Sequence, residues 1–349
     1  MDTGKETVMY QIEDYCEKLQ DSLMEYFWNE GEGVFQNHYP LKKEENWIYW
    51  WHAHAIDCLL DGYLRTKDRK YLLRAEAEYN GVYLQNGGTL LHNWYDDMEW
   101  MALALLRFFD VTGEENYKEQ VLLLWEDIKT AWNTELGGMS WKKDQRDYRN
   151  TPANAPAAIL AYRLYRRFSR REDLEWGDKI LAWNQKYLTD PITGFVWDGL
   201  NRLGDGEIDY DWRYTYNQGV MLGALLERYE IHQEKADLEL AVKIAEVTGQ
   251  ELTDARGKAA PGILPYEGED DCGLFKGIYV RYLEQLIKTL EGWSEMELML
   301  RQNARCLIEQ GVNRKGLAGG HWDVKEEECI DLAQHLSGIM LLEMASRLG

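Results

Sequence analysis

Two aspartates, Asp96 and Asp97, stand side by side in the stretch NWYDDMEW (residues 93–100). Trp94, Tyr95 and Trp100 flank them, and the apolar run MALALLRFF follows. Two carboxyl groups held together among aromatic side chains cannot both ionise freely, so the pKa of one is expected to rise. A carboxylate beside a protonated carboxylic acid is the pair that a glycosidase uses, one to attack the anomeric carbon and one to protonate the leaving oxygen. The pair therefore predicts a site that cleaves glycosidic bonds.

A structural role is the alternative for the same two residues. Asn93 can act as an N-cap, and acidic side chains in the first turn of a helix interact favourably with its dipole. Capping acids usually face water, whereas these two lie among aromatic residues, which favours the catalytic interpretation. A retaining double displacement needs carboxyl groups about 5 Å apart, a distance that the sequence does not specify.

Helices must position the pair, because nearly every periodic segment of the chain has helical spacing. From Met98 to Phe109 apolar side chains point in all directions, which predicts a helix buried on every side. This helix is expected to begin near Trp94. Five similar helices are expected to begin near Trp47, Pro152, Tyr214, Cys272 and Asp331. Amphipathic helices with more charge are expected over residues 8–28, 68–80, 116–132, 173–188, 236–252 and 294–310.

The two kinds of helix alternate, which indicates a repeated helical hairpin of roughly 45–60 residues. Six such hairpins closing on themselves form an all-α (α/α)6 toroid, in which the starts of the buried helices surround one cavity. An open superhelix of hairpins is the alternative, and the six buried helices favour closure. The chain has only six prolines and no Pro-rich linker, so residues 1–349 are expected to form a single domain.

Composition narrows the class of ligand. The formal net charge of −22 argues against nucleic acid and against an anionic membrane surface as partners. The 15 tryptophans and 22 tyrosines favour stacking on flat, partly apolar ligands such as sugar rings, although core filling is the alternative. The five cysteines are scattered without a C-x-x-C pair, so neither a disulfide framework nor a zinc site is expected. The N-terminus has no signal-peptide pattern, so we expect a cytoplasmic location and action on imported oligosaccharides.

The sequence resembles glycoside hydrolase family 76, the endo-α-1,6-mannanases, along most of its length. The resemblance rests on YDDMEWMALALLRFFDVTGEENY, GGMSW followed by NTPANAPAAILAYRLY, DPITGFVWDG, YTYNQGVMLGALL and LFKGIYVRYL, in the family's order. It implies an (α/α)6 barrel and an α-1,6-mannoside substrate. It also implies a retaining mechanism in which Asp96 is the nucleophile and Asp97 the acid/base, with no metal or organic cofactor. The sequence departs from the family's pattern at Met101 and over residues 150–155. These departures affect the details of the sugar pocket and therefore the exact substrate.

Other residues that precede or open the buried helices are candidates for substrate contacts. Helix capping for the acids, internal hydrogen bonding for the amides and core filling for the tryptophans are the alternatives. Lys276 falls in a first helical turn, where the dipole disfavours a cation, so a pairing or hydroxyl-binding role is expected. His52 and His54 are two residues apart and face different ways on a helix, so no metal site is expected there. The predicted substrate contacts are Trp47, Trp51, Trp94, Tyr95, Asn154, Asp209, Asp211, Tyr216, Asn217, Gln218, Asp270, Asp271, Phe275 and Lys276.

Two other functions remain open at this point. A sugar epimerase or isomerase on the same toroid would need bases of higher pKa, such as a pair of histidines facing the ring, and no such pair is evident. A non-catalytic glycan-binding relative would keep the cavity without turnover. The sequence leaves chain-length preference, endo or exo action and the oligomeric state open.

Overall fold

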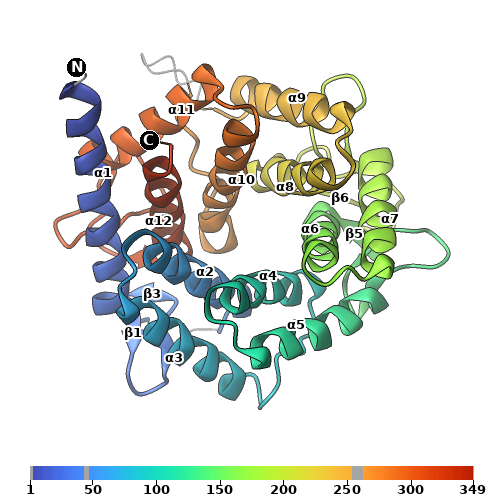
Figure 1. The fold of residues 1–349 in the computed structure, drawn as a ribbon, viewed down its shortest axis with the longest axis horizontal. Coiled ribbons are helices and arrows are strands. Elements are labelled where there is room, and N and C mark those ends of the chain that lie inside the picture. The colour runs from blue at the N-terminus through green and yellow to red at the C-terminus, as the bar shows by residue number, and fades with distance from the viewer. Residues whose placement is uncertain (1–2, 43–46, 254–261, 349) are drawn as a thin grey trace. The chain divides into compact units, whose positions relative to one another are not determined.

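Twelve α-helices account for most of residues 3–42, 47–253 and 262–348, which are the residues that the computed structural model describes (Figure 1). Six of them, termed the buried helices, begin close to their predicted positions: α2 (Tyr49–Thr66), α4 (Tyr95–Thr112), α6 (Thr151–Phe168), α8 (Thr215–His232), α10 (Phe275–Thr289) and α12 (Leu332–Ser346). The six amphipathic helices are α1 (Thr3–Ser22), α3 (Arg69–Gln85), α5 (Glu115–Ile128), α7 (Arg171–Leu188), α9 (Lys235–Glu251) and α11 (Ser294–Cys306). The predicted alternation of the two kinds of helix is confirmed.

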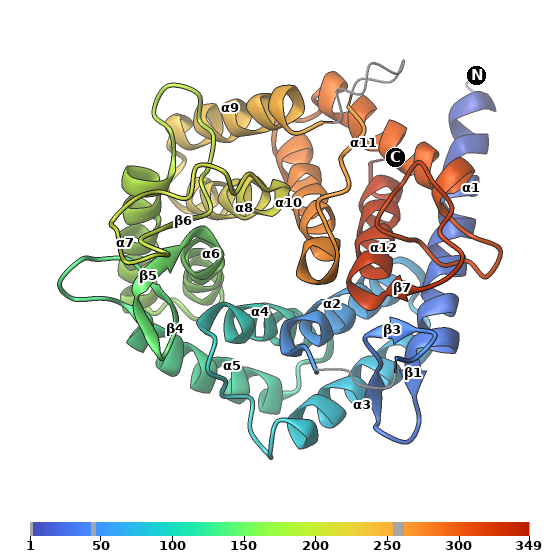
Figure 2. The same ribbon diagram turned by 180° about the vertical axis from the view of Figure 1, so that it is seen from behind.

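The helices fall into two compact units, a first unit of Met1–Gly88 with Thr253–Gly349 and a second unit of Thr89–Leu252. In the first unit α12 packs against α1, α2 and α10, and α3 packs on α2. In the second unit α6 lies between α4 and α8, while α5, α7 and α9 each pack on the buried helix that precedes them in the chain (Figures 1 and 2). The single domain expected over residues 1–349 stays a prediction.

Four of the hairpins turn at a residue in the left-handed conformation. Lys67, Gly113, Ser169 and Gln233 follow α2, α4, α6 and α8, with φ between 55° and 73°. In each case the backbone N–H of this residue bonds to a carbonyl of the last helical turn, which ends the helix and lets the next one start within a few residues. Within the described ranges, no helix is both long enough and apolar enough to cross a membrane.

Seven short strands lie in the described parts of the connections, and the sequence analysis did not predict them. In the first unit β1 (Trp28–Asn29) pairs with β2 (Val34–Phe35), and β3 (His38–Tyr39) pairs with β7 (Ile330–Asp331). In the second unit β4 (Ser140–Lys142), β5 (Gln145–Asn150) and β6 (Gly199–Leu200) form an antiparallel sheet in the order β4-β5-β6. Six of these strands have only two or three residues, which is too short for an alternating apolar pattern. The six-residue β5 has the sequence QRDYRN, which is almost entirely polar and also lacks that pattern.

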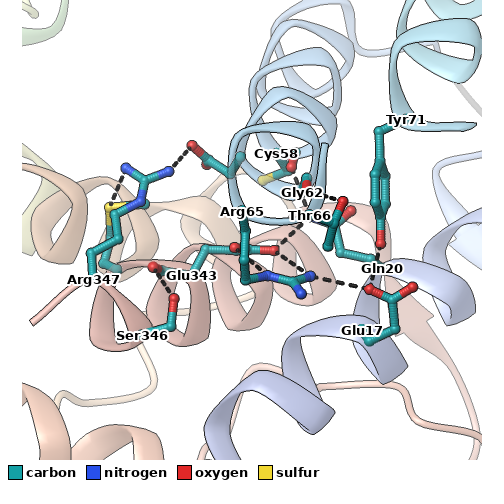
Figure 3. Close-up of polar contacts among 12 residues, drawn as sticks. Glu17, Gln20, Cys58, Gly62, Arg65, Thr66, Tyr71, Glu343, Ser346 and Arg347 are labelled. Carbon is teal, nitrogen blue, oxygen red and sulfur yellow. Dashed lines mark hydrogen bonds and ion pairs between the residues drawn. The ribbon is translucent and has the colours of Figure 1, made fainter. Parts of the chain in front are cut away.

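Charged side chains join three helices of the first unit (Figure 3). Arg65 of α2 donates from Nε to Glu343 of α12 at 3.0 Å and from Nη2 to Glu17 of α1 at 3.3 Å. Gln20 of α1 donates to both Glu343 at 3.1 Å and the Cys58 carbonyl of α2 at 2.7 Å. Because the Glu343 side chain is buried, losing Arg65 would leave an uncompensated buried charge. The network therefore fixes how these helices pack.

Candidate active site

The adjacent aspartates lie in the first turn of α4, as the sequence predicts. The N-cap is Trp94, with an extended backbone of φ −88° and ψ 128°, and not Asn93 as expected. A tryptophan side chain cannot accept a hydrogen bond from the first turn, and the backbone N–H of Asp97 instead donates to Oδ1 of Asp96 at 3.1 Å. Both carboxyl groups are partly buried at the positive end of the helix dipole, which favours negative charge there.

Asp96 has a second donor from a distant part of the sequence. Nε1 of Trp141, in β4, donates to Oδ2 of Asp96 at 2.9 Å. Each of the two carboxylate oxygens of Asp96 thus accepts a hydrogen bond. Hydrogen bonds to the ionised form favour that form, so this environment suits an aspartate that acts as an anion.

A glycine turn and a buried amide place Trp141. Gly137 and Gly138 have φ of 71° and 77°, and the ring of Trp183 packs so closely that a Cβ at Gly138 would lie 2.5 Å from it. Immediately after this turn, Asn154 of α6 accepts from the Met139 N–H at 2.8 Å and donates to its carbonyl at 3.1 Å. The GGMSW segment is therefore held to α6 on one side of Trp141 and to β5 on the other.

Asp97 has a different neighbour. Its Oδ2 lies 2.9 Å from Nδ1 of His92, whose ring packs against Trp94 with centroids 5.0 Å apart. Burial lowers the pKa of His92, the charge of Asp96 opposes this change, and the charge of Lys143 adds to it. The imidazole is therefore neutral at pH 7, so it places no fixed positive charge beside Asp97.

A third carboxyl group lies one helical turn after the pair. Glu99 is fully buried, and among the described residues no side chain donates a hydrogen bond to its two oxygens. Burial raises the pKa of Glu99 well above its usual value, and the charges of Asp96 and Asp97 raise it further, while the nearby backbone of Ala157 opposes them. Burial therefore favours the neutral, protonated form of Glu99.

Asp198, which follows β-bridged residues of the α7–α8 connection, is the centre of a second polar cluster. Its Oδ1 accepts from the hydroxyl of Tyr216 at 2.8 Å and from Nδ2 of Asn217 at 3.0 Å. Its Oδ2 accepts from the hydroxyl of Tyr148 at 3.1 Å and from Arg202 at 2.6 Å. Tyr216 and Asn217 were predicted as substrate contacts, and the structure shows both held by this buried carboxylate.

Three other predicted contacts form hydrogen bonds with the protein itself, and their sugar binding stays a prediction. Asn154 is fully buried and bonded to Met139 as described, with its amide also donating to the Asn150 carbonyl at 2.7 Å. Gln218 is likewise buried and forms two hydrogen bonds with the backbone of Val196. It accepts from the Val196 N–H at 2.9 Å and donates to the Val196 carbonyl at 2.7 Å. Tyr95 is buried, and its hydroxyl accepts from Arg146 at 2.8 Å. A buried polar group needs a partner, and here the partner is the protein itself.

The remaining candidates of the second unit lie nearer the surface. Asp209 accepts from Nε of Arg202 at 3.0 Å, and burial raises the pKa of its carboxyl group. Asp211 is exposed two residues later. Trp94 is half-buried, with its ring between His92 and Nζ of Lys142, which is 5.7 Å from the ring centroid.

In the first unit, Asp271 is held by two tryptophans of α2. Its Oδ1 accepts from Nε1 of Trp50 at 2.8 Å and of Trp51 at 2.9 Å. Trp51 is fully buried and so fills the core, whereas the half-buried Trp47 stacks on His52 with centroids 5.1 Å apart. Phe275, the first residue of α10, is also buried.

Lys276 has a structural partner as well. Its Nζ donates to the Gly320 carbonyl at 2.7 Å and lies 4.0 Å above the ring centroid of Trp322. Burial lowers the pKa of Lys276 to about 7. The lysine anchors the connection before α12, which accounts for a cation in a first helical turn without requiring a sugar.

Among the described residues of the first unit, His38, Asp270 and Asp331 have possible metal-ligand atoms within 4.8 Å of one another. Asp331 is also the N-cap of α12 in a capping box with Gln334, and its Oδ1 lies 3.3 Å from Nε2 of His38. These contacts account for the arrangement by helix capping and ion pairing, so we assign no metal role to it.

Sequence reasoning missed Trp141, His92, Asp198 and Arg202. The first stands in the GGMSW segment and the third in DPITGFVWDG, so both were within quoted motifs. Their roles depend on which side chain points toward Asp96 or Tyr216, and spacing along the chain does not give that direction. The assembled geometry places a carboxyl group that accepts two hydrogen bonds next to a second carboxyl group beside an imidazole, among aromatic side chains. Such an arrangement suits acid-assisted nucleophilic substitution at a sugar carbon.

Comparison with known proteins agrees with this geometry. A family model described as glycosyl hydrolase family 76 matches residues 11–344. A Listeria innocua protein of known crystal structure is 39% identical, with 97% of each chain covered and a TM-score of 0.90. An inactive variant of an α-1,6-mannanase from Salegentibacter sp. HEL1_6, solved with α-1,6-mannotriose, is 36% identical over 96% of this chain and 99% of that chain, with a TM-score of 0.89. Two consecutive aspartates are replaced by asparagine in that variant.

A curated relative, the mannan endo-1,6-alpha-mannosidase of Candida glabrata, is 25% identical over 226 residues, or 57% of this chain. The match spans only 48% of the length of that relative. The structural similarity assigns the fold to the all-α (α/α)6 class that the hairpin pattern predicts. Since the family model covers nearly the whole chain and the resemblance of the quoted motifs is confirmed, this protein belongs to glycosyl hydrolase family 76.

Proposed function

We propose that this protein hydrolyses α-1,6-mannosidic bonds of mannan or mannooligosaccharides with retention of the anomeric configuration. The observation that carries the proposal is the unequal environment of the adjacent aspartates. Asp96 accepts hydrogen bonds from Trp141 and from the Asp97 backbone, which favour its ionised form. Asp97 lies beside the neutral imidazole of His92, which is compatible with a protonated carboxyl group. Two carboxyl groups with different protonation states are what acid-assisted glycoside cleavage requires.

The first step is attack of an Asp96 carboxylate oxygen on the anomeric carbon. The bond from that carbon to the leaving oxygen breaks, and the leaving oxygen takes the proton of Asp97. A mannosyl ester of Asp96 and an ionised Asp97 result. In the second step Asp97 removes a proton from water, the water oxygen attacks the anomeric carbon, and Asp96 leaves as a carboxylate. Two inversions at one carbon give net retention.

The substrate class rests on the relatives. The Salegentibacter enzyme is named an α-1,6-mannanase and was solved with α-1,6-mannotriose, and the Candida glabrata relative is named a mannan endo-1,6-alpha-mannosidase. This chain has two adjacent aspartate pairs, Asp96–Asp97 and Asp270–Asp271. We assign the chemistry to the first pair because Oδ1 of Asp271 is already held by two indole N–H groups, whereas Asp97 has an imidazole partner suited to proton exchange.

The test is incubation of the purified protein with α-1,6-mannotetraose while the anomer first released is followed by NMR. The α-anomer is expected first, and release of the β-anomer would contradict retention. Asp96→Asn and Asp97→Asn are each expected to lower kcat/KM by about 1,000-fold or more. Asp110→Asn is the matched control, because this exposed aspartate lies at the other end of α4 and pairs with Arg167.

The second aspartate pair provides a further comparison. The double variant Asp270→Asn with Asp271→Asn is expected to weaken hydrolysis but to leave a measurable kcat. Complete loss of turnover in this variant, with full activity in Asp96→Asn, would move the chemistry to the other pair. Binding of mannotetraose without any product would favour the glycan-binding alternative, and conversion of free mannose to an isomer would favour the isomerase.

A further inference from the structure

The connection between α7 and α8 in the second unit exposes large apolar side chains. Ile192 is 81% exposed, Leu203 84%, Tyr210 55% and Trp212 42%. Tryptophan and tyrosine combine a large apolar ring with a polar group, and both are enriched at binding surfaces. Trp212 differs from the others because its ring packs against an arginine that is itself held by two carboxylates.

Arg202 fixes the indole of Trp212. Its guanidinium carbon lies 3.4 Å from the ring centroid of Trp212 and 4.6 Å from that of Tyr148, so the guanidinium is stacked between two aromatic rings. Its nitrogens donate to Asp198 at 2.6 Å and to Asp209 at 3.0 Å. A guanidinium with two carboxylate partners cannot reorient easily, so it orders the indole, while Trp212 stays 42% exposed.

A continuous series of side-chain contacts joins Trp212 to the candidate active site. Trp141, which donates to Asp96, packs edge-on against Tyr148 with centroids 5.8 Å apart. Tyr148 stacks on Arg202, which stacks on Trp212. The ring of Tyr214 also lies close to Trp212, with centroids 6.0 Å apart and the two rings nearly perpendicular. All of these residues belong to the second unit, so the series lies within one compact part of the protein.

We infer that Trp212 and Tyr214 form a distal sugar-binding subsite, which holds mannosyl units of a long α-1,6-mannan chain away from the bond that is cleaved. The inference rests on the proposed function and deepens it by naming a determinant of chain-length preference. A sugar ring presents an apolar C–H face to an indole and hydroxyl groups to acceptors at its edge. Asp211, exposed beside Trp212, and Asp209 supply carboxylate acceptors for those hydroxyl groups.

The charge of the surface also favours a neutral sugar over a second copy of this chain. The acidic residues Asp205, Glu207, Asp209 and Asp211 flank Trp212 in the sequence, and the chain carries a net charge of −22. A symmetric contact through this surface would bring these carboxylates close to the same carboxylates of the second copy, and the repulsion between like charges costs free energy. An uncharged chain of hydroxyl donors meets no such repulsion. The fixed indole also loses little conformational entropy on binding, because it is already ordered by Arg202.

The test compares α-1,6-mannotriose with α-1,6-mannohexaose for the wild type, Trp212→Ala and Trp212→Phe. The ratio of kcat/KM for the hexaose to that for the triose is expected to fall about fivefold to tenfold in Trp212→Ala, mostly through KM, since one stacked aromatic ring contributes on this scale. Trp212→Phe, which keeps an aromatic surface, is expected to recover most of the ratio. Trp176→Ala is the matched control, because Trp176 lies on α7 with Lys179 4.3 Å from its ring centroid.

A binding measurement separates this inference from the proposed function. Calorimetric titration of the two oligosaccharides into an Asp96→Asn, Asp97→Asn background should show tighter binding of the hexaose, and Trp212→Ala should remove that difference. Loss of the difference supports the subsite even if the wild type hydrolyses neither sugar. An unchanged ratio and unchanged binding in Trp212→Ala would overturn it, as would an equal loss for both chain lengths. A change of oligomeric state in Trp212→Ala with unchanged sugar binding would overturn it in favour of a protein contact.

Discussion

Nδ1 of His92 lies 2.9 Å from Oδ2 of Asp97, and the two residues are five positions apart on opposite sides of the start of α4. The imidazole is neutral at pH 7 because burial lowers its pKa. A neutral imidazole can accept a hydrogen bond from a protonated carboxyl group, whereas a protonated one would hold that group as an anion. The contact thus gives Asp97 a partner that is compatible with an acid.

His92→Ala is expected to move the alkaline limb of the pH–activity profile to lower pH. Removing an acceptor destabilises the neutral form of Asp97, which lowers its pKa, so the acid loses its proton earlier as the pH rises. His92→Asn keeps an acceptor near the same place and is expected to restore part of the shift. Steady-state kcat/KM measured across the pH range is the readout. An alkaline limb at the same pH in His92→Ala as in the wild type would show that His92 does not affect the protonation of Asp97.

Trp141→Phe is expected to lower kcat about tenfold or more with a smaller change in KM. The substitution removes the indole N–H that bonds to Oδ2 of Asp96 and keeps most of the ring. A hydrogen bond to a charged group contributes about 1.5–3 kcal/mol, which corresponds to a loss of this size if the bond orients the nucleophile. Rapid-mixing measurement of the first turnover checks the step concerned. A kcat within twofold of the wild type would show that Trp141 does not act through Asp96.

Glu99→Gln is expected to raise stability relative to the wild type as the pH increases. The folded-state pKa of Glu99 is raised, so above its unfolded value near 4.5 the folded protein keeps a proton that the unfolded chain has lost. Wild-type stability therefore falls by about 1.4 kcal/mol per pH unit from this group until its folded pKa is reached. Glutamine has no proton to lose, so urea unfolding of the two proteins from pH 5 to 8 should diverge. Parallel curves would contradict a buried neutral Glu99.

Lys276 is expected to affect the pH dependence of the unfolding free energy in the direction opposite to Glu99, and Lys276→Met tests this. Burial lowers the pKa of Lys276 to about 7 from its usual 10.5, so between these values the unfolded chain binds a proton that the folded protein has released. In the wild type this group makes stability rise with pH over that interval, and methionine removes the rise. Unfolding free energies at pH 7 and pH 9 are compared for both proteins. An equal pH dependence in the variant would show that Lys276 stays charged through its contact with the Gly320 carbonyl.

The order and kind of the helices were predictable because they depend on local pattern. An apolar run with helical spacing must be buried on all sides wherever it ends up, so Met98–Phe109 indicated a buried helix and placed Asp96 and Asp97 at its start. The resemblance of the motifs to those of family 76 was also predictable, because the order of residues in a motif can be compared without knowing how the chain folds. The sequence did not predict which side chains contact Asp96 and Asp97.

Those partners were decided by tertiary structure. Trp141 reaches Asp96 across 45 positions of sequence because Asn154 and a glycine turn hold β4 against α6. A buried amide must find partners, but its spacing does not say whether they are sugar hydroxyls or backbone, and for Asn154 and Gln218 they are backbone. Composition and periodicity act over a few residues and set the helices, whereas the direction of a side chain and the identity of its neighbour depend on contacts between distant segments.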